Sequence, residues 1–329
     1  MSSFNAAARH LAPGVTMSAV VAVAATFLAE HYHAPVMLFA LLLGMAVNFL
    51  SAEGKPKAGI EFTSREVLRV GVALLGIRIT FGQIAALGWE PVALVIGSVV
   101  VTIVVSMLAA RALGFPGIFG MLTGGATAIC GASAALALAA ALPGAPRKEQ
   151  ATLFTVIGVS ALSTVAMIAY PAITRALDLD PGAASVFLGG TIHDVAQVVA
   201  AGYMISPEVG DGATFVKLLR VAMLLPVVLV FSLVFRTRGE GGNRPPLLPG
   251  FLIGFAILVV INSLGIIPKP VTDAASHLSR WCLVVAIAAL GVKTSLQQLA
   301  SLGWRPVLML AVDTVFLAGL ILGGLLIWR

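Results

Sequence analysis

The sequence predicts an all-α integral membrane protein, and three observations carry this prediction. Hydrophobic residues make up 59% of the 329 residues and charged residues only 10%, whereas a soluble domain is closer to one quarter charged. Apolar runs long enough to cross the ~30 Å hydrocarbon core recur along the chain. Short turns rich in proline, glycine and charge separate these runs. Such a chain folds as a bundle of membrane spans.

About eleven apolar segments can be delimited. Two arrangements fit their lengths: nine spans plus two re-entrant hairpins, or eleven spans of which two are broken helices. Hairpin arms of about 10–13 residues would each reach about 15–20 Å, roughly half the bilayer. The segments cover residues 14–30, 36–50, 66–88, 91–113, 117–142, 150–174, 183–204, 214–235, 248–267, 279–302 and 305–328.

The basic residues of the short loops set the expected orientation, because cytoplasmic loops carry an excess of lysine and arginine. They place the second and eighth loops, together with the N-terminus, in the cytoplasm. The residues concerned are Lys55, Lys57 and Arg65 in the second loop and Arg236, Arg238 and Arg244 in the eighth.

Several functional classes are disfavoured. The net charge of +6 is spread over short loops rather than gathered in one patch, so we expect no nucleic-acid partner. The two cysteines suggest no disulfide framework, and no His, Cys or carboxylate spacing indicates a metal site. No phosphate loop or G-x-S-x-G motif is present. We therefore expect no enzyme, no metal and no cofactor.

Part of the sequence of the third segment is repeated in the tenth. "LGIRITFGQIAALGWEP" begins at Leu75 and returns at Leu290 as "LGVKTSLQQLASLGWRP", with 8 of 17 positions identical. Arg78 aligns with Lys293. Chance similarity between apolar helices is the alternative, but the shared Gln, Trp and Pro argue against it. If every segment crosses, the two copies run in opposite directions, which is the inverted repeat typical of secondary transporters.

The repeat divides the chain. We treat residues 1–329 as a single membrane transporter domain with an extra N-terminal span at 14–30. The first repeat covers 36–175, and the second, permuted and inverted, covers 183–328.

The fifth and seventh segments each carry a glycine pair, Gly124-Gly125 and Gly189-Gly190. Glycine inside a helix costs roughly 1 kcal/mol relative to alanine, so a pair favours a break. Broken backbone at membrane depth lines a cavity or is buried in protein. A helix that restarts after the break presents free N–H groups and a positive dipole end, which suit an anion. Close packing of helices through small residues is the alternative interpretation.

Few ionisable residues lie within the apolar segments, and each central charge costs at least ~2.5 kcal/mol on insertion scales, so each needs a partner or a wet cavity. His193 is the histidine in the middle of an apolar segment. The charged residues that we assign to the interior are Arg69, Arg78, Asp194, Lys293 and Asp313.

Three interpretations of these charges stay open. Two cations and two carboxylates could form structural ion pairs. Alternatively, Arg78 and Lys293 attract an anion while His193 and Asp194 couple its movement to protons or cations. In the third, the repeated helices end just after these cations, which then guard the two mouths of the pathway, with tryptophans as interfacial anchors.

With "LGIRITFGQIAALGW", "GGATAICGASAALA" and "GGTIHDVAQVVAAG" in view, the chain resembles the YeiH family of bacterial membrane proteins, which carry the description of sulfate exporters. The resemblance covers nearly the whole chain. It implies a multi-pass protein of the bacterial inner membrane. It also implies a distant similarity to the sodium/proton antiporter and bile-acid symporter folds, in which discontinuous helices meet at the site.

The motifs give a set of expected site residues. Arg78, Lys293 and the motif residues would bind substrate, while His193, Asp194 and Asp313 would serve coupling. The motif residues expected at the substrate site are Gly124, Gly125, Thr127, Cys130, Gly131, Ser133, Gly189, Gly190, Thr191 and Gln197.

The sequence thus leads to a secondary transporter that exports a small inorganic oxyanion, such as sulfate or sulfite, by alternating access. Candidate partners are the anion, H+ or Na+ as coupling ion, the lipid bilayer and a second copy of the chain. Two alternatives stay open: a cation/proton antiporter using Asp194 and Asp313, and a membrane scaffold without transport activity.

Overall fold

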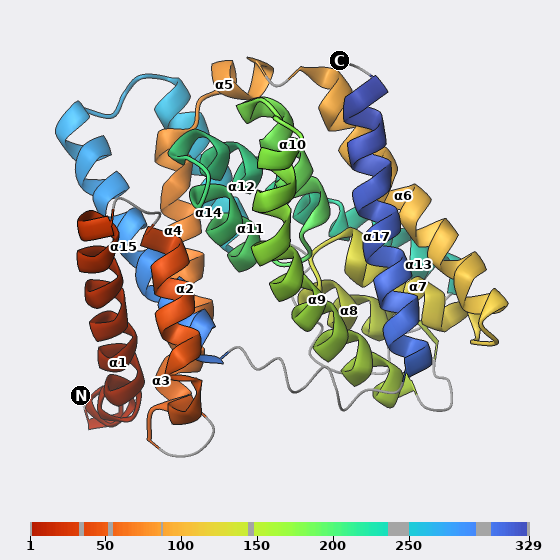
Figure 1. The fold of residues 1–329 in the computed structure, drawn as a ribbon, viewed down its shortest axis with the longest axis horizontal. Coiled ribbons are helices and arrows are strands. Elements are labelled where there is room, and N and C mark those ends of the chain that lie inside the picture. Colours follow the sequence, from red (N-terminus) through yellow and green to blue (C-terminus); the bar gives the residue numbers. More distant parts are fainter. Residues whose placement is uncertain are drawn as a thin grey trace. The chain divides into compact units, whose positions relative to one another are not determined.

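The computed structural model describes residues 2–32, 36–51, 55–86, 88–143, 148–235, 250–293 and 304–327. All regular structure within these ranges is helical (Figure 1), which confirms the all-α prediction. Among the described residues, six helices are long and apolar enough to cross a membrane. They are Arg9–Tyr32, Trp89–Ala112, Gln150–Ala176, Pro207–Phe235, Lys269–Lys293 and Arg305–Ile327.

The chain forms two compact units, each built from segments that are distant in the sequence. The first unit contains Met1–Ala86, Val199–Asp211 and Gly250–Ser295. The second contains Leu87–Val198, Gly212–Pro249 and Leu296–Arg329. Two helices, α11 (Val195–Tyr203) and α12 (Pro207–Ala222), continue from one unit into the other.

In the first unit, α1, α2 and α15 pack side by side (Figure 1). Gly44 of α2 and Gly291 of α15 bring these two backbones together, since a Cβ at either glycine would collide with a carbonyl oxygen of the other helix. The helices of this unit are α1 (Ser2–Tyr32), α2 (Val36–Ala46), η1 (Asn48–Ser51), α3 (Lys57–Phe62), η2 (Thr63–Val67), α4 (Leu68–Leu75), η3 (Gly76–Arg78), α5 (Phe81–Ala86), α14 (Gly250–Ser263) and α15 (Lys269–Lys293).

In the second unit, α6 packs along α7, and α17 packs against α6, α10, α7 and α9. The fifth and seventh predicted segments are each two short helices separated by an irregular stretch. The helices of this unit are α6 (Trp89–Ala112), α7 (Gly117–Ala128), α8 (Ala132–Ala141), α9 (Lys148–Ala176), α10 (Pro181–Thr191), α13 (Leu224–Phe235) and α17 (Trp304–Ile327), together with parts of α11 and α12.

The third predicted segment, 66–88, is wrong as one continuous span. A run of helical turns begins earlier, at Lys57, and ends at Arg78. Ile79 is extended, with φ −102° and ψ 138°, and a separate short helix follows. The break is stable because α14 satisfies its polar groups: Asn262 donates to the carbonyl of Ile79 at 3.3 Å, and the Phe81 N–H donates to the hydroxyl of Ser263 at 2.9 Å.

The first repeated helix ends at Arg78, as the third interpretation of the charges expected. The second, α15, is described as far as Lys293, and the expected end near Thr294 lies outside the described residues. The two copies share a kind of contact. Asn262 donates to the carbonyl of Ile79, just after Arg78, and Asn48 donates to the carbonyl of Val292, just before Lys293, at 2.7 Å. An asparagine therefore binds the backbone next to each aligned cation.

Candidate functional site

The second unit contains two interrupted helices whose breaks lie against each other. Helix α7 ends at Ala128 and α8 restarts at Ala132; α10 ends at Thr191 and α11 restarts at Val195. The two breaks touch, since a Cβ placed on Gly131 would lie 3.5 Å from the carbonyl oxygen of His193. We call the place where residues 129–131 and 192–194 meet the crossing. This contact brings together the two motifs that the sequence singled out.

The first break depends on Gly131. Its backbone has φ +66° and ψ −126°, a conformation that residues with a Cβ avoid. The Gly131 N–H still closes back on Ala126 at 2.8 Å. The carbonyls of Thr127, Ala128 and Ile129 are left beyond the last helical turn, where an α-helix leaves acceptors without intrahelical partners.

Arg220 binds backbone carbonyls at the ends of both α7 and α10. The Arg220 side chain is 0% exposed. Its Nε donates to Ala128 at 2.7 Å and its Nη2 to Thr127 at 2.7 Å, both at the end of α7. Its Nη1 donates to Gly189 at 3.3 Å and to Ile192 at 3.2 Å, at the end of α10. One guanidinium therefore joins the two helix ends.

Lys217, one turn earlier on α12, completes the arrangement. Its side chain is also 0% exposed. Its Nζ donates to the carbonyl of Ile129 at 2.7 Å and to that of Ile192 at 2.9 Å. Together the two cations satisfy five carbonyl groups of the two breaks.

Electrostatics explains why cations stand here. The C-terminal end of a helix carries about half a negative charge, and two such ends meet at this point. Taking a cation out of water costs several kcal/mol, and the charged hydrogen bonds to carbonyls, at about 1.5–3 kcal/mol each, offset this cost. Lys217 and Arg220 therefore neutralise the negative ends of α7 and α10.

The helices that restart after the breaks, α8 and α11, carry exposed or partly exposed polar residues at their first turns. Ser133, in the first turn of α8, is exposed, and Asp194, just before α11, is partly exposed. Asp194 caps α11 by accepting the N–H of Ala196 at 3.0 Å, whereas α8 has no side-chain cap. The Cys130 thiol contacts the backbone N–H of Ala134 in the first turn of α8, so among the described residues no charged side chain caps this positive helix end.

His193 links the second break to the rest of the unit. Its Nδ1 lies 3.2 Å from the carbonyl of Thr127 and its Nε2 lies 2.9 Å from the hydroxyl of Thr314. A carbonyl can only accept, so the contact with Thr127 places a proton on Nδ1. The Thr314 hydroxyl has a single hydrogen and also lies 2.8 Å from the carbonyl of Leu310, so Nε2 and Leu310 share that donor. The ring is completely buried and holds α10 and α11 against α7 and α17.

The side-chain amide of Gln197 forms hydrogen bonds with two hydroxyl groups of α9. It accepts from the hydroxyl of Ser163 at 2.6 Å and donates to the hydroxyl of Thr164 at 3.0 Å. Ser163 in turn accepts the N–H of Asp194 at 3.1 Å. This chain fixes the start of α11, so Gln197 orients the break rather than presenting a free amide to the crossing.

The glycine pairs lie inside helices, so the expectation that the chain breaks at the pairs is corrected. A Cβ at Gly189 would collide with the carbonyl oxygen of Ala213 and lie 2.8 Å from Cβ of Val216. A Cβ at Gly124 would likewise collide with Ser106. These glycines allow close helix packing, the alternative interpretation, and the breaks follow three to five residues later, at 129–131 and 192–194.

The remaining motif residues surround the crossing. Cys130 is 6% exposed and lies within the first break. Thr127 has a buried hydroxyl without a hydrogen-bond partner among the described residues. The Thr191 hydroxyl donates to the carbonyl of Phe187 in its own helix.

Arg78 and Lys293 belong to the first unit, whereas both glycine pairs belong to the second. Arg78 Nη2 forms an ion pair with Asp211 at 3.0 Å, and its Nη1 donates to the hydroxyl of Tyr203 at 3.3 Å. Tyr203 also donates to Asp211. Lys293 is exposed at the end of α15, 3.8 Å from Glu61. The structural interpretation paired Arg78 and Lys293 with the interior carboxylates, and this pairing is wrong: their partners are Asp211 and Glu61, respectively.

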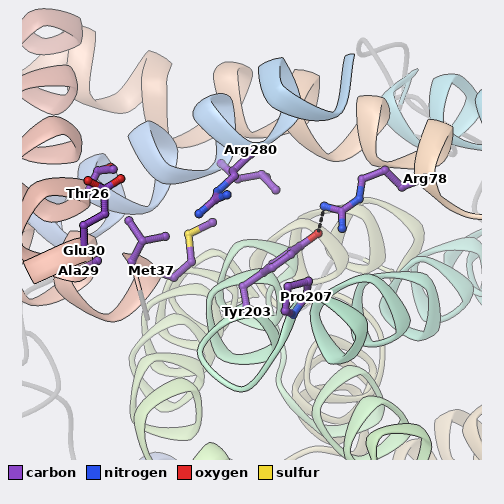
Figure 2. A pocket seen from close by; sticks show the side chains of 10 residues that line it. Thr26, Ala29, Glu30, Met37, Arg78, Tyr203, Pro207 and Arg280 are labelled. Atoms are coloured by element: carbon purple, nitrogen blue, oxygen red, sulfur yellow. Dashed lines mark hydrogen bonds between the residues drawn. The ribbon is translucent and has the colours of Figure 1, made fainter. Parts of the chain in front are cut away.

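Arg78 also borders a pocket of about 350 Å³ within the first unit. Figure 2 shows Arg78 and Arg280 reaching this pocket from different helices, with the Tyr203 hydroxyl against Arg78. Glu30 of α1 lines the same pocket. It is thus a second polar location in the fold, with charges of both signs.

Removing either partner of the Arg78–Asp211 pair is expected to destabilise the protein by about 1–2 kcal/mol, because the pair is partly buried and hydrogen-bonded. Thermal unfolding of Arg78→Ala, Asp211→Asn and the double variant checks this. The double variant should lose less than the sum of the single losses. Strictly additive losses would show that the pair contributes nothing.

Lys217 and Arg220 were missed by sequence reasoning, although both lie within the predicted segment 214–235. The signal was present in "FVKLLRVAM": two cations three residues apart in an apolar run. This spacing places both on one helix face, where they need shared acceptors. Asp313 was identified, and it is 1% exposed with Ser106 donating to it at 2.7 Å.

The chain matches relatives over nearly its whole length. The family model described as "Conserved hypothetical protein 698" matches residues 13–310. A UPF0324 membrane protein of Chlorobaculum tepidum is 56% identical over 96% of this chain and 89% of its own. UPF0324 membrane protein TauZ of Paracoccus pantotrophus is 54% identical over 95% and 94%, respectively. A UPF0324 membrane protein of Rhizobium meliloti is 49% identical over 95% and 92%. The chain therefore belongs to this family of UPF0324 membrane proteins, the YeiH family, which its glycine motifs resemble.

Proposed function

We propose that the protein is a secondary transporter of the bacterial inner membrane that exports a small inorganic oxyanion, such as sulfate or sulfite, by alternating access. The proposal also takes the two copies of the repeat as inverted, with the N-terminus in the cytoplasm. A transporter with this plan binds its substrate where discontinuous helices meet.

One observation carries the proposal: buried cations occupy the negative helix ends at the crossing and leave a positive end accessible. Lys217 and Arg220 bind the carbonyls of α7 and α10. The N-terminus of α8, which has no charged cap, carries about half a positive charge and N–H groups that suit an oxyanion. The exposed hydroxyl of Ser133 lies in that first turn.

Asp194 makes the N-termini of α8 and α11 unequal as anion sites. Its carboxylate already caps α11, so it competes with an anion for that helix end. The oxyanion would therefore bind at α8, while Asp194 limits affinity by repulsion. Moderate affinity suits a transporter, because the substrate has to leave the site as readily as it enters.

The flux of radiolabelled sulfate and sulfite into proteoliposomes that contain the purified full chain tests the proposal. The assays are run with and without a pH gradient. Chloride and taurine serve as competitors. Chloride is an anion without oxygen atoms, and taurine carries a sulfonate, whose three oxygens on sulfur resemble those of sulfite, together with an ammonium. We expect saturable oxyanion flux that sulfate and sulfite inhibit and chloride does not. Absence of flux for every oxyanion would refute the function.

Asp194→Asn separates anion transport from cation/proton antiport. Asparagine caps a helix about as well as aspartate, so the change removes charge and little structure. For anion transport we expect the apparent KM for the oxyanion to fall about five-fold, because about 1 kcal/mol of repulsion is removed. An antiporter that binds its cation at Asp194 would instead lose its pH-driven sodium flux. Initial rates over a range of sulfate and sodium concentrations distinguish the two.

A further inference from the structure

Another polar centre, apart from the crossing, lies inside the helices of the second unit, around Asp313. Asp313 is the tenth residue of α17, which places it about 14 Å along a helix of about 36 Å. Its side chain is 1% exposed. The Ser106 hydroxyl of α6 donates to its Oδ2 at 2.7 Å, and Ser106 also lies 3.1 Å from the hydroxyl of Thr123 on α7. Three helices thus meet at one carboxyl group.

The other oxygen of this carboxyl group is unsatisfied. Among the described residues, Asp313 Oδ1 is buried without a hydrogen-bond partner. The Thr102 hydroxyl, one turn before Ser106 on α6, is buried and unpartnered as well. A carboxylate offers about four acceptor positions, two on each oxygen, and those of Oδ1 are unfilled among the described residues. The surrounding residues therefore hold the carboxyl group in place through Oδ2, but they do not give an ionised carboxylate the hydrogen bonds that it needs on Oδ1.

No cation reaches Asp313 from the part of the chain that the structure describes. His193, in the stretch between α10 and α11, binds Thr314, the chain neighbour of Asp313. Lys217 and Arg220 are bound to carbonyls instead. The other charged residues of the helices packed against α17, and of α17 itself, stand at helix ends: Glu90, Arg111, Lys148, Glu149, Arg175 and Arg305.

A buried carboxylate without a cation costs far more free energy than a neutral carboxylic acid. A proton is the smallest group that removes this cost, and the unsatisfied Oδ1 is the atom on which it would reside. Releasing the proton would leave a charge that only water or a cation could stabilise. The ionised form therefore belongs to a conformation in which the centre is open to water.

We propose that Asp313 is the proton-carrying residue of the transport cycle. Its carboxyl group takes up a proton from water on one side, carries it on Oδ1 while the centre is closed, and releases it to water on the other side. Ser106 positions the carboxyl group through its hydrogen bond to Oδ2. This inference rests on the proposed transport function, because a proton carrier needs a transported partner.

Asp313→Asn tests the proposal, since asparagine keeps the shape of the neutral acid and cannot release a proton. In proteoliposomes we expect the variant to lose all stimulation of sulfate flux by a pH gradient. Exchange of labelled for unlabelled sulfate at equal pH should continue, because the oxyanion site at α8 is unchanged. A variant that keeps its response to the pH gradient would overturn the proposal.

Infrared difference spectra give a readout that does not depend on transport. In wild-type protein, a change of pH should reveal the C=O stretching band of a protonated carboxylic acid, shifted in D2O. Asp313→Asn should lack this band. Ser106→Ala should move it to higher frequency, because the hydrogen bond to Oδ2 is lost. Ser98→Ala is the matched control, because Ser98 is buried on the same helix but donates to Val95.

The outcomes separate this inference from the function itself. If wild-type protein moves no oxyanion but shows the Asp313 band, the transport proposal fails and the protonation of Asp313 stands. If oxyanion flux is present but independent of the pH gradient, or depends on sodium rather than protons, the proton-carrier proposal fails. If Asp313→Asn does not fold, the band of wild-type protein and its shift in Ser106→Ala decide.

Discussion

Replacing Arg220 by methionine is expected to abolish transport and to destabilise the protein by about 3 kcal/mol. Four carbonyl groups at the crossing lose a hydrogen bond. Those of Thr127 and Ile192 keep His193 and Lys217 as partners. Those of Ala128 and Gly189, in contrast, lose their side-chain donor, at about 1–3 kcal/mol for each one left unsatisfied. Removing a buried charge recovers part of this loss, since burying that charge cost several kcal/mol. The apparent melting temperature of the purified protein and its flux in proteoliposomes measure the two effects.

Arg111→Met is the matched control for Arg220→Met. Arg111 is exposed in the last turn of α6, and such surface changes usually stay within about 0.5 kcal/mol. Arg220→Lys should be intermediate, because it keeps the charge but loses the fork that reaches both helix ends. Wild-type stability and flux in Arg220→Met would show that the crossing does not depend on these bonds.

Gly189→Ala is expected to have the second large effect. The new Cβ would collide with the carbonyl oxygen of Ala213 on α12. Overpacking of this kind costs about 1–3 kcal/mol, and the collision is with backbone, which cannot rotate away. Helix α12 carries Lys217 and Arg220, so its displacement would also pull both cations from the breaks. We expect a loss of flux together with a lower melting temperature.

The neighbouring Gly190→Ala provides the comparison. A Cβ there would lie 3.4 Å from the Ile321 side chain, close to ordinary contact, and alanine favours the helix by about 1 kcal/mol. Flux and stability should therefore match or exceed the wild type. Equal damage from both substitutions would refute the packing role of Gly189 and point to a requirement for the pair as such.

The sequence predicted the positions of the two breaks to within a few residues, but the prediction wrongly attributed the breaks to the glycine pairs. A glycine pair in an apolar run indicates either a break or close packing, and the composition of the run does not separate the two. Gly189 faces α12, a helix that begins about twenty residues later in the chain. The break comes further on, at 192–194, where Lys217 and Arg220 satisfy the freed carbonyls.

The repeat predicted one local feature correctly. Arg78 and Lys293 align in the sequence, and the helix that carries Arg78 ends at this residue, as one interpretation of the charges expected. What each cation binds was not predictable, because Asp211 approaches Arg78 only through the packing of distant segments. Two aligned cations therefore have unlike surroundings: one in a partly buried ion pair, the other exposed near Glu61.

The sequence by itself determined the class, the family and the approximate positions of the breaks. Hydrophobicity and glycine content act locally, so they can be read along the chain. The tertiary structure alone decided which groups face one another at the breaks. Neutralising two helix ends takes donors from a third helix, and Lys217 and Arg220 lie about ninety residues beyond the first break that they stabilise. Long-range electrostatic pairing has no local signature, so the partners became identifiable only once the helices were packed.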